Sequence, residues 1–427
     1  MGRLVGRVLR AAGVDAVYGA PLAGVRVAAV DDPGVATVMA GAHARVHGHP
    51  AAVHRGDGTI VVGGHGGDPP EVEAASAEDL LAAVEAVQAA ARGAGPGVGL
   101  RIVVDPEAPA PDILPDPPPP PDRWSPPDED LVARLTSAAR PVILAGPGVV
   151  RDGAVPGLHA LAAAAGLGVL NTWGAKGMFD WRSRHHLATA GLQAHDFELG
   201  GLADADVVVA TGVDPAEAPP GRWRHLAPAV EVAPGALGPL AEVWSRPAAA
   251  IAVPPLRAGL ARVTQEGWSS TGAPLAPSLV TRHYAAEVGA AGLVAADPGV
   301  AGYWVARTFA TTTLGSVAVP GSGGPGFAVA CAAVARLRSP DRPVLAVVDG
   351  PAGDAVEAAL DAGRRLGVRV PVEAWWPGGE ALDADAHRAR LRRLVHGDAP
   401  AVAGLATDGR QLDRMVAVAG PVVAWRA

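Results

Sequence analysis

Short apolar runs alternate along the chain with longer alanine-rich segments. PVILAGPGV (141–149), ADVVVATGVD (205–214) and VLAVVDG (344–350) are apolar until they reach a Gly, Pro or Asp, whereas DAVEAALDAGRRLG (354–367) has the composition of a helix. Strands that are apolar throughout are buried on both faces, and their alternation with helices is typical of parallel sheets. The pattern therefore predicts an α/β protein built from doubly wound parallel sheets.

Proline-rich stretches divide this pattern into three parts. Residues 111–127 contain a run of prolines that fixes φ and removes N–H groups, so we predict an extended linker there. A softer break, WSSTGAPLAPS, covers 268–278. We therefore predict three α/β domains, at 1–110, 128–267 and 279–427.

Charge and composition exclude several classes of protein. The net charge of −8, with 35 Lys and Arg against 43 Asp and Glu, gives no basic footprint for nucleic acid. The one cysteine, Cys331, excludes an intramolecular disulfide and a Cys-rich metal cluster. The first residues are amphipathic, unlike a signal peptide, and no long apolar run lacks charge or proline. We expect a cytoplasmic protein that binds neither nucleic acid nor membrane.

A glycine-rich turn in the C-terminal part is the densest candidate site. Gly321, Gly323 and Gly326 form G-x-G-x-x-G before a helical segment, and the next apolar run ends at Asp349. Such glycines let the backbone approach a pyrophosphate, and an acid after the next strand reaches a ribose hydroxyl. The alternative is a loop that needs glycine only for packing. The motif alone leaves three interpretations of Asp349: a metal ligand, a nucleotide ligand, or the residue that ends a strand.

The central part offers a second candidate. Gly146, Gly148 and Gly212 follow predicted strands, where the carboxyl ends of parallel strands often hold phosphate. The alternative is that they only make tight turns. Asn171 and Lys176, the only asparagine and the only lysine of the chain, lie close together in NTWGAKG and would either contact an anion or belong to a solvated loop.

Histidines give a weaker signal. His43 and His47 are four residues apart, which would place both imidazoles on one helix face. No acid accompanies them as in H-E-x-x-H, so we predict solvated histidines. His185 and His186 are adjacent and would point apart, which favours a surface loop over a metal site.

Several sequence blocks in the three parts are distinctive. The C-terminal blocks are ADPGVAGYW (296–304), PGSGGPGF (320–327) and SPDRPVLAVVDG (339–350); the central ones include RPVILAGPGV and NTWGAKG; the N-terminal ones are LRAAGVDAVYGAP and VMAGAHARVHG. The C-terminal blocks are similar to the C-terminal domain of the thiamine diphosphate enzymes typified by acetolactate synthase and benzoylformate decarboxylase. The central blocks resemble that family's central domain, and the N-terminal blocks resemble the opening of its pyrimidine-binding domain.

This resemblance implies three domains and a cofactor site. In the family, an Asp in Gly-Asp-Gly and a later Asn hold the divalent metal that carries the cofactor's diphosphate, because Mg²⁺ prefers oxygen ligands. Asp349 falls on the aspartate position, with Val348 in place of the first glycine. The cofactor-binding residues implied here are Gly321, Gly323, Gly324, Gly326, Asp349 and Gly350, with Asp349 also as the metal ligand.

Several departures from the family fall on different parts of that site. The second metal ligand would fall near Trp376–Gly378, where the chain has no asparagine, leaving Glu380 or Asp383 as substitutes. The glutamate that promotes the imino tautomer of the aminopyrimidine is replaced by Pro33, with Asp31 and Asp32 just before it.

Two further departures concern shape rather than chemistry. Pro325 replaces the bulky apolar residue that bends the cofactor in the family. The N-terminal part is also shorter than a full α/β domain.

These departures predict a degenerate member of the family with no catalytic residue assigned. They argue against thiamine diphosphate and Mg²⁺, and we do not expect the FAD that acetolactate synthase binds in its central domain. Such a chain would serve as a structural or partner subunit, as a homodimer or higher homo-oligomer or beside an active homologue. Two alternatives remain open: an active thiamine diphosphate-dependent 2-oxo-acid lyase or carboligase with a remodelled site, and a nucleotide-binding protein that uses its glycine-rich turns.

Overall fold

The computed structural model describes residues 2–22, 25–63, 71–74, 76–82, 86–87, 99–104, 129–248, 250–321, 323–397 and 402–425. Within it the chain forms two compact units. The first unit comprises Met1–Asp122, Ser322–Asp341 and Gly353–Val370, and the second comprises Arg123–Gly321, Arg342–Ala352 and Pro371–Ala427. The predicted linker at 111–127 lies outside the described residues.

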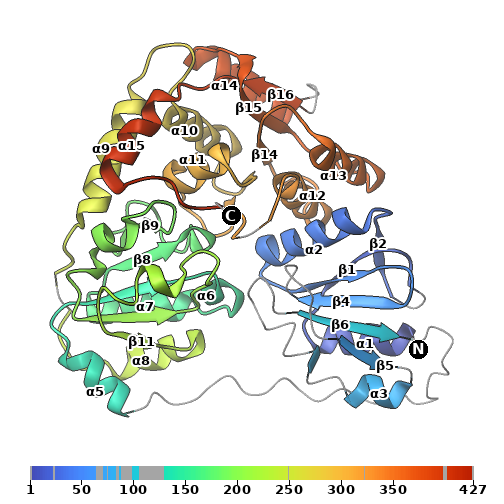
Figure 1. Ribbon diagram of the computed structural model, residues 1–427, viewed down its shortest axis with the longest axis horizontal. Coiled ribbons are helices and arrows are strands. Elements are labelled where there is room, and N and C mark those ends of the chain that lie inside the picture. Colours follow the sequence, from blue (N-terminus) through green and yellow to red (C-terminus); the bar gives the residue numbers. More distant parts are fainter. Residues whose placement is uncertain are drawn as a thin grey trace. The chain divides into compact units, whose positions relative to one another are not determined.

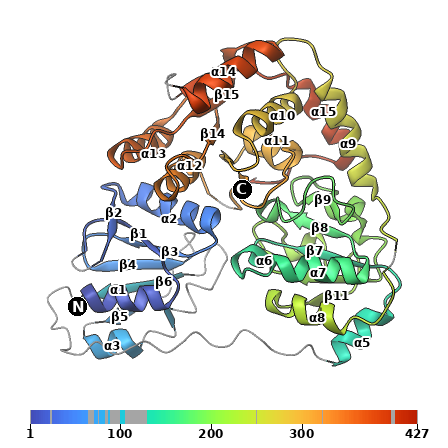
Figure 2. The same ribbon diagram turned by 180° about the vertical axis from the view of Figure 1, so that it is seen from behind.

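The first unit contains a six-stranded sheet in the order β2-β1-β3-β4-β6-β5. Figure 2 shows α2 along one face of this sheet and α1 with α3 on the other. The strands are β1 (Ala16–Gly19), β2 (Val27–Ala29), β3 (Ala51–His54), β4 (Thr59–Gly63), β5 (Glu71–Ala74) and β6 (Gly99–Val104); the helices are α1 (Gly2–Ala11), α2 (Pro33–His47), α3 (Ala77–Ala82), α12 (Phe327–Arg338) and α13 (Asp354–Arg365).

One strand of this sheet differs from the all-parallel prediction. β4 runs antiparallel to both β3 and β6. Gly56 and Gly58, with φ of 92° and 85°, lie between β3 and β4 and supply the left-handed backbone that a tight reversal requires. The remaining pairs, β1 with β2, β1 with β3 and β5 with β6, are parallel as predicted.

The second unit begins with a five-stranded parallel sheet in the order β11-β10-β7-β8-β9. Its central strands are largely apolar and buried; Val207–Thr211, for example, is buried at every position. The elements, labelled in Figure 1, are β7 (Pro141–Ala145), β8 (Val169–Thr172), β9 (His186–Ala190), β10 (Val207–Thr211) and β11 (Ala229–Glu231), with α5 (Glu129–Ser137), α6 (Gly148–Arg151), α7 (Val155–Ala165), α8 (Leu237–Val243), α9 (Pro255–Trp268) and the short helices η1 (Trp173–Ala175), η2 (Glu198–Leu202), η3 (Pro220–Arg222) and η4 (Pro234–Ala236).

The same unit contains a second five-stranded parallel sheet, in the order β13-β12-β14-β15-β16. One continuous apolar core joins both sheets, from Leu170 in the central sheet to Val347 in this one. The elements are β12 (Leu293–Ala296), β13 (Val317–Ala318), β14 (Val344–Asp349), β15 (Val372–Glu380) and β16 (Val402–Leu405), with α10 (Pro277–Val288), α11 (Val300–Thr308), α14 (Ala384–His396) and α15 (Arg410–Ala419).

The predicted fold class is confirmed: the chain is α/β with three sheets. Among the described residues, no helix combines the length and the apolar character needed to cross a membrane.

Candidate functional site

Asp349 lies at the end of β14, where its carboxylate meets the first turn of α11. The Asp349 Oδ2 and Oδ1 atoms accept hydrogen bonds from the backbone N–H groups of Val300 (2.5 Å) and Ala301 (2.7 Å). Gly299, with φ of 121°, allows this approach, because a Cβ there would lie 2.0 Å from Asp349 Oδ2. The residue as a whole is exposed, but shielding of its carboxylate from solvent raises the pKa of Asp349, whereas the two N–H groups act in the opposite direction. Asp349 therefore caps a helix with both of its oxygens.

The two acids predicted as substitute metal ligands are also bound to other groups. Glu380 Oε2 lies 3.4 Å from Arg390 Nη1. Asp383 is the N-cap of α14 and accepts a hydrogen bond from the Ala386 N–H at 2.8 Å. Across the described part of the chain, no group of three or more His, Cys, Asp or Glu side chains is placed to hold a metal ion.

The glycine-rich turn is divided between the two units. Gly323 and Gly324 are exposed, as is Pro325, and all three precede α12 in the first unit. Gly326, with φ of 92°, is the N-cap of α12, and a Cβ there would lie 2.9 Å from the Ala355 carbonyl oxygen. Glycine is thus required at 326 by the close packing of α12 on the residues that begin α13.

Gly321 and Gly350 belong to the second unit. A Cβ on Gly321 would lie 3.0 Å from Oε1 of Glu217, a fully buried acid whose Oε2 accepts hydrogen bonds from Thr172 (2.5 Å) and Gly174 (2.8 Å). Gly350 has a φ of 76° and makes the turn after β14. Each of these glycines has a packing or turn role within its own unit.

The residues near the predicted glutamate position start α2. Asp32 is the N-cap of α2 and accepts hydrogen bonds from the N–H groups of Gly34 (2.7 Å) and Val35 (3.0 Å), and Pro33 opens the first turn. Asp31 forms an ion pair with Arg365 of α13. Both acids are therefore used to fix the first unit.

In the central sheet, the glycines after β7 and β10 bring two backbones together. The N–H groups of Gly146 and Gly148 donate to the carbonyl oxygens of Thr211 (2.9 Å) and Gly212 (2.8 Å). A Cβ on Gly146 would lie 2.3 Å from the Gly212 oxygen. These contacts support the tight-turn interpretation, because the N–H groups that would bind a phosphate already have partners.

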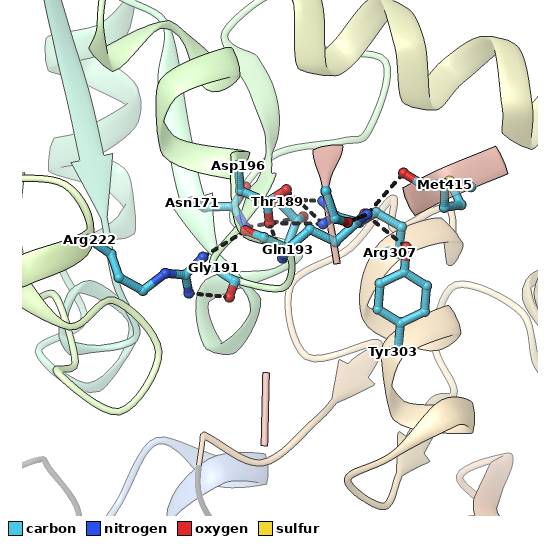
Figure 3. Close-up of polar contacts among 10 residues, drawn as sticks. Asn171, Thr189, Gly191, Gln193, Asp196, Arg222, Tyr303, Arg307 and Met415 are labelled. Carbon is cyan, nitrogen blue, oxygen red and sulfur yellow. Dashed lines mark hydrogen bonds and ion pairs between the residues drawn. The ribbon is translucent and has the colours of Figure 1, made fainter. Parts of the chain in front are cut away.

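A buried ion pair that has no signal in the sequence joins the two sheets of the second unit (Figure 3). Arg307 Nη2 of α11 donates to both carboxylate oxygens of Asp196 at 2.9 and 2.8 Å, and the two side chains are 1% and 0% exposed. Arg307 Nη1 donates to the Thr189 carbonyl oxygen at 2.7 Å. The bidentate geometry fixes α11 against the segment that follows β9.

Gln193 extends this arrangement to the end of the chain. Its Oε1 accepts a hydrogen bond from the Tyr303 hydroxyl at 2.8 Å, and its Nε2 donates to the carbonyl oxygens of Met415 (2.9 Å) and Gly420 (2.7 Å). The Arg222 guanidinium donates to the Gln193 carbonyl oxygen at 2.6 Å. Figure 3 labels Tyr303, Met415 and Arg222 around Gln193, so the loop after β9 contacts segments that are far apart in the sequence.

A second buried network surrounds Glu373 of β15. Glu373 accepts hydrogen bonds from the Tyr284 hydroxyl and from Arg390 Nη2 (2.8 Å), and lies 3.2 Å from His387 Nε2. Burial alone would raise the pKa of Glu373, but His387 and Arg390 outweigh it and lower that pKa to about 2. Trp375 is buried, and its indole N–H donates to the Tyr284 hydroxyl at 2.7 Å.

The prediction of solvated histidines is wrong for His43. Its side chain is buried on α2, with Nε2 2.5 Å from Asp15 Oδ1 and Nδ1 2.9 Å from the Tyr18 hydroxyl. Asp15 also binds Arg338 Nη1 of α12 at 2.8 Å. Burial lowers the pKa of His43 although Asp15 raises it. The error arose because the acid comes from a distant element.

The solvated-loop alternative for NTWGAKG is also wrong. Asn171 is 3% and Lys176 is 7% exposed. Asn171 Nδ2 donates to the Thr172 carbonyl oxygen at 2.9 Å. Burial lowers the pKa of Lys176 to about 7, with a further lowering by the charge of Arg307.

A comparison with known families gives a match for the middle of the chain. Residues 129–234 match the thiamine pyrophosphate enzyme central domain. The matched segment contains β7 to β11 and therefore the whole central sheet. The resemblance predicted for this part is thus supported, whereas the residues implied for the cofactor lie outside it. A comparison with curated proteins finds no match.

The residues at the implied cofactor positions do not fit thiamine diphosphate held through Mg²⁺. Both Asp349 oxygens accept helix N–H groups, and the chain's only asparagine, Asn171, is in the central sheet. Glu380 and Asp383 are engaged by Arg390 and by α14. We therefore derive no catalytic step through this cofactor.

Proposed function

We propose that this chain is a thiamine diphosphate enzyme-family protein, resembling acetolactate synthase, that lacks the family's own catalysis and acts as a structural or partner subunit. The engagement of Asp349 is the observation that carries the proposal. Its carboxylate satisfies the N-terminus of α11, a role that stabilises a helix irrespective of any cofactor.

The same pattern recurs at the other positions where the family places cofactor chemistry. Asp32 caps α2, Asp31 pairs with Arg365, and Asp383 caps α14. Each acid thus has an internal partner and a stabilising role. The three sheets are nevertheless present and carry well-packed cores, which supports a retained architectural role.

As a subunit, the chain would form a homodimer or a higher homo-oligomer, or would pair with an active homologue. Light scattering on the purified chain tests the first form: a mass of two or more chains is expected. A protein that stays monomeric at high concentration would leave only pairing with a homologue.

Calorimetry tests the loss of the cofactor. Titrating thiamine diphosphate with Mg²⁺ into the purified chain should give no heat beyond that of Mg²⁺ alone. A micromolar dissociation constant that disappears in Asp349→Ala would refute the proposal and favour an active lyase or carboligase. In that case pyruvate or benzoylformate should be consumed by the wild-type chain and not by the variant.

Mass spectrometry of the purified protein addresses the nucleotide-binding alternative. We expect no bound adenine nucleotide. A stoichiometric nucleotide on the purified chain would contradict a purely structural role.

A further inference from the structure

Two buried histidines, His283 of α10 and His387 of α14, face each other in the second unit. Their Nδ1 atoms are 2.8 Å apart, and their ring centroids are 5.1 Å apart with the planes tilted by 34°. The two residues are 6% and 0% exposed. Two nitrogens at this distance share a hydrogen bond, so one Nδ1 atom carries a proton and the other offers a lone pair.

The opposite side of His387 limits where protons can lie. His387 Nε2 is 3.2 Å from Oε2 of Glu373, whose Oε1 accepts from Arg390 at 2.8 Å. Glu373 has a pKa of about 2, because His387 and Arg390 outweigh the effect of its burial. An ionised carboxylate only accepts hydrogen bonds, so His387 Nε2 carries a proton.

The pair can hold one added proton without losing its hydrogen bond. A neutral His387 accepts at Nδ1 from the N–H of His283, and a charged His387 donates from Nδ1 to a neutral His283. A second added proton would place N–H groups on both Nδ1 atoms. The bond between α10 and α14 would then be replaced by two positive charges that face each other in the protein interior.

No free acid offsets that second charge. The groups that act on His283 are His387 and Arg388 of α14 with Arg282 and Glu287 of α10, and those that act on Glu373 are His387, Arg390 and Tyr284. Glu287 already binds Arg388 at 2.8 Å and Arg392 at 2.9 Å. Burial, followed by the charges of His387 and Arg388, lowers the pKa of His283 to about 4, although Glu287 raises it.

We propose that His283 and His387 form a proton-sensitive latch, which holds α14 against α10 while the two imidazoles share a hydrogen bond and releases α14 when both are charged. Release would expose Leu391, Leu394 and Val395, the buried apolar residues of α14. The latch residues are not among the positions implied for thiamine diphosphate, so the latch does not depend on the proposed function.

Hydrogen exchange of the α14 amides, corrected for the intrinsic exchange rate at each pH, tests the latch. In the open state His283 binds a proton with the ordinary pKa of 6.5 instead of about 4, so the closed state is fully favoured above pH 6.5 and loses stability as the pH falls to 4. Protection factors across α14 should therefore fall about fortyfold between pH 6 and pH 4. Glu373 remains ionised in this range. Unchanged protection would overturn the proposal.

A substitution isolates the contribution of His283. In His283→Asn, the amide replaces Nδ1 and can still bind His387, but it takes up no proton, and asparagine has nearly the helix propensity of histidine. The fall in α14 protection should be at least about tenfold smaller than in wild type. His225→Asn, at an exposed position, should behave as wild type. Equal losses in wild type and a His283→Asn protein that circular dichroism shows to be folded would overturn the proposal.

Nuclear magnetic resonance of ¹⁵N-histidine gives a measurement on the wild-type chain. At pH 6 a coupling across the hydrogen bond should join the two Nδ1 nuclei, with a proton on one of them. This coupling should be lost as the pH falls below 4, when His283 gains its second N–H group. A His283 ring that already carries two N–H groups at pH 6 would contradict the latch.

Discussion

The buried Lys176 predicts an unusual response of stability to pH. Replacing it with methionine keeps the length of the side chain and removes the amine. The groups facing it are Arg307 of α11, neutralised by Asp196, and His186 of β9. The Lys176→Met variant should therefore be more stable than wild type near pH 7.

The magnitude follows from the two pKa values of Lys176. The pKa is about 7 in the folded chain, against 10.5 for an ordinary lysine, so the unfolded chain binds a proton that the folded chain lacks between these pH values. Wild-type stability should consequently rise with pH across this window. At low pH the buried Lys176 lowers the free energy of unfolding of the wild type by about 5 kcal/mol. About 4 kcal/mol of this loss applies at pH 7 and about 2 kcal/mol remains at pH 9.

Urea unfolding followed by tryptophan fluorescence at several pH values from 6 to 9 measures this difference. The advantage of Lys176→Met should shrink by about 2 kcal/mol between pH 7 and pH 9. Arg134→Met is the matched control, because it removes an exposed cation of the same unit and should give a small, nearly constant difference. A Lys176→Met difference that does not change with pH would refute the assigned burial of the ammonium.

Three further substitutions test the other buried or capping acids. Asp349→Ala should lower the free energy of unfolding by about 1 kcal/mol, because α11 loses its N-terminal cap; unchanged urea stability would contradict the capping role. Asp196→Ala should cost about 3 to 5 kcal/mol by leaving Arg307 buried and unpaired, and Asp196→Leu combined with Arg307→Met should recover much of this loss in the same assay. The pKa of Glu373 is about 2, against 4.5 for an ordinary glutamate, so its contribution of about 3 kcal/mol is present above pH 4.5 and is lost as the pH falls towards 2. An acid titration by circular dichroism should show a flatter response between pH 4.5 and 2 for Glu373→Gln, and identical profiles would argue against this pKa.

The strands could be predicted where the apolar pattern was continuous. The runs at 141–149, 205–214 and 344–350 contain β7, β10 and β14, because a strand buried on both faces needs apolar residues at successive positions. The reversal into β4 is less visible, since only two glycines and an aspartate mark it. The prediction of parallel strands was therefore wrong for β4, which runs antiparallel to both of its neighbours.

The buried polar groups could not be predicted, because their partners are far apart in the sequence. Asp196 and Arg307 are separated by 111 positions, and Asp15 and His43 by 28. Local periodicity contains no information on such pairs, which depend on how elements pack. By contrast, the resemblance of the central blocks to a family domain is supported by the family match over 129–234.

The contacts of the loop after β9 affect how the chain folds during its synthesis. Gln193 binds Met415 and Gly420 across 222 and 227 positions, so these hydrogen bonds cannot form until residues 415 and 420 have been synthesised. Contacts of such long range form late and slow the search for the native state. Until then the loop after β9 lacks these partners, and a nascent chain stopped before residue 415 should be sensitive to proteolysis there.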